Sequence, residues 1–302
     1  MRNFVAVFMD INSTSMDILI ADSGSTKTEW LLDGGADAAE GCAPYVFRTS
    51  GLNPSLMADA EIVSVLRNEL VPFLRGRHTD RVVFFGAGCT PSQSLRMATL
   101  LRAVLAAATV EVMSDLEGAA LALCGDREGV VAILGTGSGS ALYDGRRFVQ
   151  HTPSLGYILG DEGSGAVLGR NFISDLYKGM FPTQVATRAL PMLGDDMTGI
   201  IENVYRRPRA NRYLASFTHV VRELEDEPSV RDFLVRNFEA FFRRNILPYG
   251  RTELPVHFVG SIAAVFESRL REAAAECGCR VGDIVQSPLQ RMAEHLRGRG
   301  RQ

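Results

Sequence analysis

The segment DILIADSGSTKTEWLLD, residues 17–33, decides the fold of this chain. Its apolar run from Asp17 to Asp22 is compatible with a β-strand, and TEWLLD, from Thr28 to Asp33, alternates like a returning strand. The residues between them are glycine, serine, threonine and lysine, which is more than a tight hairpin needs. The segment therefore predicts a β-hairpin with an overlong, polar turn.

A second segment repeats this pattern. The run GVVAILG, from Gly129 to Gly135, leads into the turn TGSG and then into SALYDG, which is again compatible with a strand. Both segments thus consist of a strand, a glycine turn rich in hydroxyl groups and a second strand. We interpret them as one supersecondary device used twice, which predicts two related halves.

Helices and strands alternate around the two hairpins. Strands separated by helices predict a mainly parallel sheet with helices on its faces, here joined to antiparallel hairpins, which is an α/β fold. The repeat places a hinge between the halves near residue 112. The predicted helices are residues 59–74, 91–108, 116–124, most of 162–245, 262–276 and a last helix from about Ser287, and the other predicted strands are Arg81–Gly86, Val110–Ser114 and Pro255–Gly260.

Composition narrows the class of protein. With 302 residues and 46% hydrophobic composition, the chain can form two cores of ordinary size. Its net charge of -3 and its lack of a dense basic run argue against nucleic acid as a partner. No apolar run approaches the roughly 20 residues that span a bilayer, so we expect a soluble protein without a membrane partner.

Cysteine usage and the first residues indicate the compartment. The cysteines are an odd set scattered along the chain, which favours reduced thiols and therefore the cytoplasm. Residues 1–15 lack the long apolar core of a secretory signal, and we interpret them as a disordered extension that precedes the first domain. The cysteines are Cys42, Cys89, Cys124, Cys277 and Cys279.

Both predicted turns have the chemistry of a phosphate site. The first, DSGSTKTE, sets Asp22 at a strand end ahead of four hydroxyls and Lys27, so the turn can donate to phosphate oxygens while the carboxylate holds hydrated Mg²⁺. The second, LGTGSGS, is followed by a strand rather than a helix, which excludes a dinucleotide-binding fingerprint. Each turn alone could be merely structural, but the pair favours phosphate binding.

Four other motifs carry candidate polar groups. Asp115 in MSDLEGA could orient and deprotonate an attacking hydroxyl, or it could cap a helix. Asp161 in LGDEGSGAVLGR could face a ligand or cap the next helix, as could Glu162. Asn53 in GLNPS is either a ligand contact or a turn former. The segment FVGSIAAVF, residues 258–266, could approach a nucleotide through its bare Gly-Ser backbone or could be a simple turn.

Taken in order, these motifs carry a resemblance. ADSGSTKTE, GLNPS, MSDLEGA, LGTGSGS, LGDEGSG and FVGS resemble the N-acetylglucosamine kinases and the wider BadF/BadG/BcrA/BcrD ATPases of the sugar kinase/actin/Hsp70 superfamily. The likeness runs from about Met16 to Gln302. It implies two actin-like ATPase domains, ribonuclease H-like in fold, with a cleft between them. We expect them at residues 16–112 with the C-terminal helix 288–302, and at 113–287.

The resemblance also implies roles for individual residues. It makes Asp115 the catalytic base, and it gives Asp22 the role of holding Mg²⁺ through water. One departure is Leu155, which stands before Gly156 where amino-sugar kinases often have Trp. The implied ATP contacts are Asp22, Gly24, Ser25, Thr26, Lys27, Thr136, Gly260, Ser261 and Val265, and the implied sugar contacts are Asn53, Asp115, Ser138, Gly139, Gly156 and Asp161.

The resulting functional prediction is an ATP-dependent amino-sugar kinase, above all an N-acetylglucosamine kinase. Its cofactors would be ATP and Mg²⁺, its partners would be the sugar and ATP, and it could form a homodimer. Alternatives are a kinase for glucosamine or muramic acid derivatives, an ATPase activator of a 2-hydroxyacyl-CoA dehydratase, a sugar-sensing regulator and an actin-like ATPase. The sequence leaves open the sugar, the phosphorylated hydroxyl and the oligomeric state. We expect Asn53 to contact only the sugar.

Overall fold

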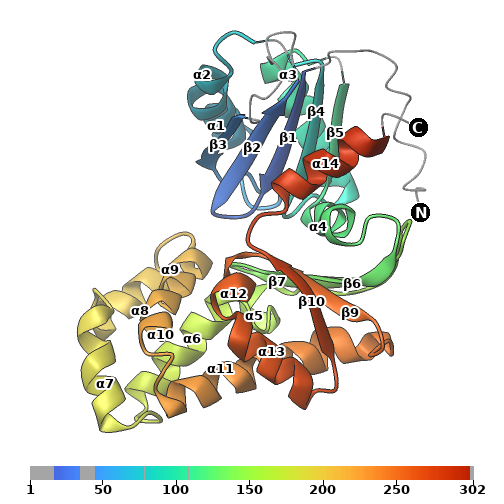
Figure 1. Cartoon of the computed structure of the whole chain (residues 1–302). Helices are drawn as coiled ribbons and strands as arrows, with labels where there is room; N and C mark the ends of the chain where they lie inside the picture. Colours follow the sequence, from blue (N-terminus) through green and yellow to red (C-terminus); the bar gives the residue numbers. More distant parts are fainter. Residues whose placement is uncertain (1–16, 35–44, 78, 108, 300–302) are drawn as a thin grey trace. The chain divides into compact units, whose positions relative to one another are not determined.

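A computed structural model describes residues 17–34, 45–77, 79–107 and 109–299 of the chain (Figure 1). The predicted extension at residues 1–15 and Cys42 lie outside the described residues. The chain divides into two compact units, Met1–Arg127 with Ser287–Gln302, and Glu128–Gln286. We call them the first and the second unit.

The first unit holds a mixed sheet, five-stranded in the part of the chain that is described, in the order β3-β2-β1-β4-β5. The predicted hairpin forms its centre, because β1 pairs antiparallel with β2 and parallel with β4. Parallel pairing of β4 with β5 then aligns the carboxyl ends of β1, β4 and β5 at one edge. The strands are β1 (Ile18–Ser23), β2 (Lys27–Asp33), β3 (Tyr45–Ser50), β4 (Arg81–Gly86) and β5 (Thr109–Ser114).

Helices cover both faces of this sheet. Leu19 and Ala21 pack on one face with residues of the helices from Asp59 to Leu74 and of α3, whereas Ile20 points to the other face with residues of α4 and α14. Successive side chains of β1 therefore point to opposite faces of the sheet, and each face belongs to an apolar layer. The helices are α1 (Asp59–Val65), continued by a π-helical turn at Leu66–Leu70 and by α2 (Val71–Leu74), then α3 (Pro91–Leu105), α4 (Asp115–Leu123) and α14 (Leu289–Arg299).

The second unit repeats this topology. Its described strands form a sheet in the order β10-β9-β6-β7-β8, with an antiparallel hairpin β6-β7 and parallel pairing of β6 with β9. Strands β6 to β10 thus follow the same connectivity as β1 to β5, which confirms the predicted repeat. The strands are β6 (Glu128–Leu134), β7 (Ser138–Asp144), β8 (Phe148–Thr152), β9 (Pro255–Val259) and β10 (Arg280–Val285).

Phenylalanine side chains form much of the core of the second unit. Phe258 of β9 lies beside Phe241 and Phe242, and Phe172 stacks edge-on with Phe233. The helices that supply this core are amphipathic, as their sequence pattern predicts. They and the other helical segments are α5 (Gly156–Leu159), α6 (Gly165–Tyr177), α7 (Thr183–Ala189), a short turn at Leu190–Met192, α8 (Met197–Tyr205), α9 (Ala210–Ser216), α10 (Thr218–Glu223), α11 (Pro228–Phe241), turns at Phe242–Ile246 and Leu247–Tyr249, α12 (Ser261–Val265) and α13 (Glu267–Glu276).

The structure confirms the predicted mixed α/β class and both hairpins. It adds β3, β8 and β10, which the sequence did not indicate, and it divides the predicted helix 262–276 at Phe266. The first unit also includes α4, beyond the hinge expected near residue 112, and the domain limits given above stay predictions. Within the described ranges, no helix has the length and apolar character needed to cross a bilayer.

Candidate active site

The turn of the first hairpin is held by buried hydroxyl groups. Ser23 Oγ and Thr28 Oγ1 are 2.6 Å apart, and both residues are fully buried. The Gly24 N–H group donates to the Lys27 carbonyl at 3.0 Å, which closes the turn. The hydroxyl groups of Ser23 and Thr28 are buried in this hydrogen bond, so Ser25 and Thr26 are the hydroxyl residues of the turn that reach the surface.

The loop after β3 is joined to this turn. The Gly51 N–H group donates to the Thr26 carbonyl at 3.1 Å, and the Leu52 N–H group donates to Ser23 Oγ at 3.1 Å. Asn53, which is 8% exposed, donates from Nδ2 to Ser25 Oγ at 3.3 Å. Asn53 is thus bonded to a residue of the phosphate-type turn, and its contact with the sugar stays a prediction.

Lys27 is paired within its own hairpin. Its Nζ lies 2.9 Å from Glu29 Oε1, and Arg48 donates to the same oxygen from Nε at 2.8 Å. Burial works to raise the pKa of Glu29, but hydrogen bonds from Ser287, Lys27 and Arg48 outweigh it and hold the pKa below its usual value. Sequence reasoning missed Glu29, which fixes the cation expected to contact phosphate.

Two carboxylates meet at the aligned carboxyl ends of the strands. Asp22 is the penultimate residue of β1, and Asp115 directly follows β5. Burial, reinforced by the negative charges of Asp115 and Glu29, raises the pKa of Asp22 to about 7, although Lys27 opposes the shift. This edge of the first sheet therefore carries an excess of negative charge, which a cation would relieve.

Asp115 is not the cap of α4. Ser114 takes that role, because its Oγ accepts from the Glu117 N–H group at 3.2 Å while Glu117 Oε2 accepts from the Ser114 N–H group at 2.7 Å. Asp115 occupies the first helical position and accepts from the Leu116 N–H group at 3.0 Å. Burial raises the pKa of Asp115 to about 6, backbone N–H groups lower it, and the charge of Glu117 raises it.

The turn of the second hairpin is held by backbone groups. The Gly165 N–H group donates to the Gly135 carbonyl at 2.8 Å, and the Ala166 N–H group donates to the Thr136 carbonyl at 3.1 Å. Gly260 lies against the same turn with φ at 123°, where a Cβ atom would come within 2.3 Å of the Leu134 carbonyl oxygen. The first turn of α6 and Gly260 thus fix Thr136 through the main chain.

Asp161 lies beside this second turn. Its φ of 53° is left-handed, which is unusual for a residue with a Cβ atom, and Ser164 rather than Asp161 caps α6 by accepting from the Val167 N–H group at 3.3 Å. Burial raises the pKa of Asp161 to about 6 against hydrogen bonds from the Gly156 and Ser138 N–H groups. Neither candidate carboxylate is therefore explained by helix capping.

The remaining predicted contacts lie at the surface or in the strand of the second unit. Gly139 pairs with Ile133 inside the hairpin, while Ser261 and Val265 are exposed on α12. Leu155, next to Gly156, is 57% exposed. The first unit places Asp22, Gly24, Ser25, Thr26, Lys27, Asn53 and Asp115 around one turn and its neighbouring strand ends, and the second unit contains Thr136, Ser138, Gly139, Gly156, Asp161, Gly260, Ser261 and Val265.

A magnesium ion fits the chemistry of the first unit. The described residues contain no group of three or more His, Cys, Asp or Glu side chains arranged to bind a metal. Mg²⁺, however, keeps several waters and usually takes one or two protein carboxylates together with substrate phosphates. Asp22, whose pKa is raised by burial and further by neighbouring negative charge, suits that mode of binding.

Solved structures with the same fold cover almost the entire chain. A protein of Porphyromonas gingivalis, assigned as an N-acetylglucosamine kinase, is 42% identical over 92% of this chain and 98% of that one, with a TM-score of 0.86. A Chromobacterium violaceum protein with the same assignment is 18% identical over 94% and 100%, with a TM-score of 0.73. A ROK family glucokinase of Streptomyces griseus, solved with glucose and AMPPNP, is 13% identical over 93% and 99%, with a TM-score of 0.57.

These comparisons confirm the predicted fold of actin-like sugar kinases. The similarities to the Chromobacterium violaceum and Streptomyces griseus structures show the fold alone, because the sequence identities are low. No protein-family model matches the chain, and no curated protein matches it.

Proposed function

Because the chain belongs to the N-acetylglucosamine kinase family of sugar kinases, we propose that it transfers the γ-phosphoryl group of ATP to a hydroxyl of an amino sugar. The observation that carries this proposal is the state of Asp115. Its carboxylate lies at a strand end beside the first turn, is not used as a helix cap, and has a pKa of about 6. A base poised near the working pH is what a hydroxyl acceptor requires.

Asp115 would act on the acceptor hydroxyl. One Oδ atom accepts a hydrogen bond from that hydroxyl, orients its oxygen toward the γ-phosphorus and takes its proton as the oxygen–phosphorus bond forms. The bond that breaks joins the γ-phosphorus to the oxygen of the β-phosphate, so ADP leaves. The Leu116 N–H group bonded to Asp115 Oδ1 holds the carboxylate in position.

Asp22 would hold Mg²⁺ through water. When bound, the ion supplies positive charge that offsets the charge of the phosphate oxygens. Gly24, Ser25 and Thr26 of the first turn would contact the phosphates, as would Thr136 of the second. In the structure the ammonium of Lys27 forms an ion pair with Glu29. To contact a phosphate, Lys27 would therefore bind Glu29 and the phosphate together or would break its ion pair with Glu29.

The sugar contacts would be side-chain and backbone groups of the residues that the resemblance implies. Asn53 and Asp161 offer amide and carboxylate groups that can bond sugar hydroxyls and an acetamido group. Ser138, Gly139 and Gly156 would add contacts, and Ser261 and Val265 would adjoin the adenosine. Leu155 offers an exposed apolar surface beside Gly156 in place of an aromatic ring.

A cytoplasmic location follows as a further part of the proposal. Cys89 and Cys124 are buried, as small apolar residues of a core are. Residues of this kind are typical of reducing compartments, and they are poorly placed to bind an exposed iron–sulfur cluster. A homodimer stays a prediction.

The test is an ADP-release assay with Mg-ATP. The acceptors are N-acetylglucosamine, glucosamine, N-acetylmuramic acid and plain hexoses, with a control that lacks sugar. We expect a sugar-dependent rate on one amino sugar, which would identify the acceptor. ADP release that is the same with and without every sugar would contradict the proposal and favour an actin-like ATPase or a dehydratase activator.

A further inference from the structure

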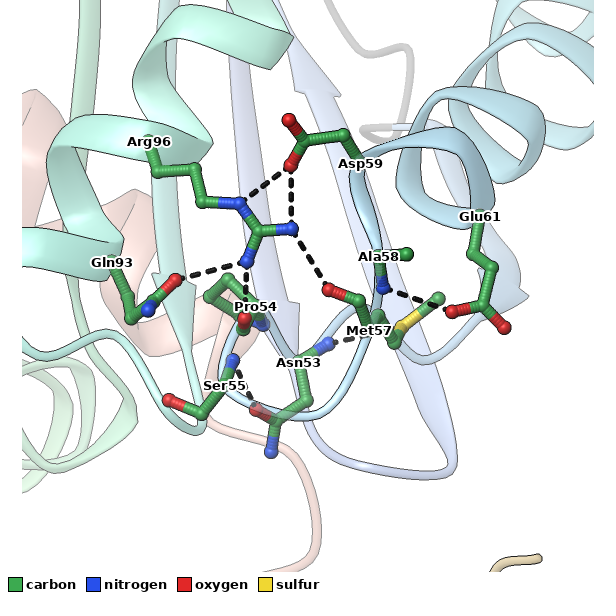
Figure 2. Close-up of polar contacts among 9 residues, drawn as sticks. All are labelled: Asn53, Pro54, Ser55, Met57, Ala58, Asp59, Glu61, Gln93 and Arg96. Carbon is green, nitrogen blue, oxygen red and sulfur yellow. Dashed lines mark hydrogen bonds and ion pairs between the residues drawn. The ribbon is translucent and has the colours of Figure 1, made fainter.

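A single arginine holds the loop that carries Asn53. Figure 2 shows Arg96 of α3 reaching across to the segment from Pro54 to Asp59. The guanidinium donates from NH1 to the Pro54 carbonyl at 2.6 Å and from NH2 to the Met57 carbonyl at 2.9 Å. It also pairs with Asp59 Oδ1 at 2.5 Å. Three acceptors of this segment therefore bind one side chain, and a fourth contact, to Gln93 Oε1 at 3.0 Å, lies within α3 itself.

The loop has few bonds of its own. Leu56 and Met57 donate their N–H groups to the Asn53 carbonyl at 3.0 and 3.1 Å, and Asn53 Oδ1 accepts from the Ser55 N–H group at 3.0 Å. Those bonds close the turn but do not attach it to the sheet. Leu52, which precedes Asn53, is bonded to Ser23 and Thr28 of the first turn. The loop itself is attached through Arg96, and through Ser25 and the turn at Gly88.

The contact at Gly88 shows how little freedom Asn53 has. A Cβ atom on Gly88 would come within 2.1 Å of Asn53 Oδ1, so the amide packs directly on bare backbone. Ser55 Oγ donates to the Gly88 carbonyl at 2.7 Å. A shift of the loop away from Gly88 would therefore change the position of the Asn53 amide, and Arg96 opposes that shift.

We propose that Arg96 is a positioning residue for the acceptor site, which fixes the loop from Asn53 to Met57 so that the Asn53 amide is held ready before the sugar binds. This inference rests on the proposed function. Arg96 does not touch the predicted phosphate contacts, and its side chain is 31% exposed, so its effect is conveyed by the backbone carbonyls that it holds. The role belongs to sugar binding rather than to ATP binding.

The geometry requires a guanidinium group. Its planar fork can donate to two carbonyls and a carboxylate at once, whereas an ammonium is a point charge on a flexible stem. Arg96→Lys should therefore hold the Asp59 ion pair but lose one of the two carbonyl contacts. We expect its effect to lie between those of the wild type and Arg96→Ala.

The kinetic experiment compares Arg96→Ala with Arg102→Ala. Arg102 lies on the same helix and donates to the Val110 carbonyl at 3.2 Å, away from the loop, so it is a matched control. We expect Arg96→Ala to lower kcat/KM for the sugar by about 10²-fold, mainly through KM, because misplacement of a binding group by about 1 Å has effects of this size. The KM for ATP should change far less, and Arg102→Ala should leave both KM values unchanged.

A rescue measurement separates positioning from general damage. Added guanidinium ion at low millimolar concentration should lower the sugar KM of Arg96→Ala and should not affect Arg102→Ala. An unchanged sugar KM in Arg96→Ala, or equal rises of the sugar and ATP KM values, would overturn the inference. If Arg96→Ala does not fold, Asp59→Asn keeps the side-chain shape and should raise the sugar KM in the same direction by a smaller factor.

Amide hydrogen exchange distinguishes this inference from the proposed function. Loss of Arg96 should speed exchange at Leu56 and Met57 in the free protein, and Arg102→Ala should not. If the wild type shows no sugar-dependent ADP release, the proposed function fails, whereas the exchange result still decides whether Arg96 holds the loop. Unchanged exchange in Arg96→Ala would overturn the positioning role whatever the assay shows.

Discussion

The two hairpin turns are alike in sequence pattern and topology but are held in different ways. The first turn relies on side chains, with Ser23 bonded to Thr28 and to the backbone of Leu52, and Asn53 bonded to Ser25. The second relies on the main chain, with the first N–H groups of α6 donating to its carbonyls. The same device thus tolerates different substitutions in the two units.

This difference follows from what lies behind each turn. The loop after β3 lies next to the first turn, and the hydroxyl of Ser23 and the amide of Asn53 form the hydrogen bonds between them. Helix α6 begins next to the second turn, and its first N–H groups, which have no partner within the helix, donate to the turn carbonyls. Removal of the hydroxyl or amide groups should therefore destabilise the first turn, whereas replacement of a glycine by a residue with a Cβ atom should destabilise the second.

The largest expected effect separates the two candidate carboxylates. Asp115→Asn should lower turnover by about 10² or more, since a general base is removed, and ATP binding should remain. Asp161→Asn, in the second unit, should mainly raise the sugar KM. Steady-state kinetics with saturating ATP and varied sugar would check both, and unchanged turnover in Asp115→Asn would exclude its role as the base.

Gly260→Ala tests the main-chain support of the second turn. The new Cβ atom would lie within 2.3 Å of the Leu134 carbonyl oxygen at a φ of 123°, so we expect a loss of about 2–3 kcal/mol in the free energy of unfolding. Gly135→Ala is the matched control, because a Cβ atom there meets nothing within 4 Å. Urea unfolding followed by circular dichroism would measure both, and equal losses would refute the steric reason.

The pH dependence should be opposite for stability and activity. The pKa of Asp115 and of Asp161 is about 6 in the folded protein, above the usual 3.8. Each therefore contributes stability that is fully present below pH 3.8 and is lost as the pH rises through 6. Meanwhile kcat/KM should fall as the pH drops below about 6, because the base becomes protonated.

The substitution Asp115→Asn tests whether the pH dependence of stability arises in the first unit. At pH 8, Asp115→Asn should stabilise the protein by on the order of 1–2 kcal/mol, which is less than the full shift because the half-buried carboxyl is partly screened by water. Trp30, the one tryptophan of the sequence, is buried in β2 and reports on the first unit. Its unfolding transition should respond to Asp115→Asn more than to Asp161→Asn, and the gain should vanish near pH 4.

The smallest expected effect lies in the hydroxyl pair of the first turn. Ser23→Ala and Thr28→Val should each destabilise the first unit, and a double-mutant cycle should give a coupling of about 1 kcal/mol, the usual net value of a buried hydrogen bond. Trp30 fluorescence during urea unfolding is the measurement. Strictly additive losses would mean that the two hydroxyls do not support the turn together.

Sequence reasoning found the hairpins because their signals are local. Alternating apolar residues and glycine turns lie within a few positions of one another, and both hairpins are as predicted. The strands β3, β8 and β10, each an edge of its sheet, were missed. Their short sequences, such as FVQHT in β8, carry little pattern of their own.

The site shows the same limit. The motif residues could be identified from the sequence, but Arg96 and Glu29 act through partners that local spacing does not reveal. Nothing near Arg96 in the sequence indicates that it reaches Pro54, which lies 42 positions earlier. The capping question was open because Ser114 and Asp115 are adjacent and both can cap. Glu117, three residues after Ser114, completes a capping box and could have decided it.

Helix α14 has a consequence for biosynthesis. Leu289, Met292 and Leu296 complete the apolar layer of the first unit against Ile20 and Leu121, yet they leave the ribosome only after all of the second unit. Until then, one face of the sheet of the first unit is covered by α4 without α14, while the second unit can already fold. A ribosome that stalls late in translation would release a chain whose earliest-made part is the one left unfinished.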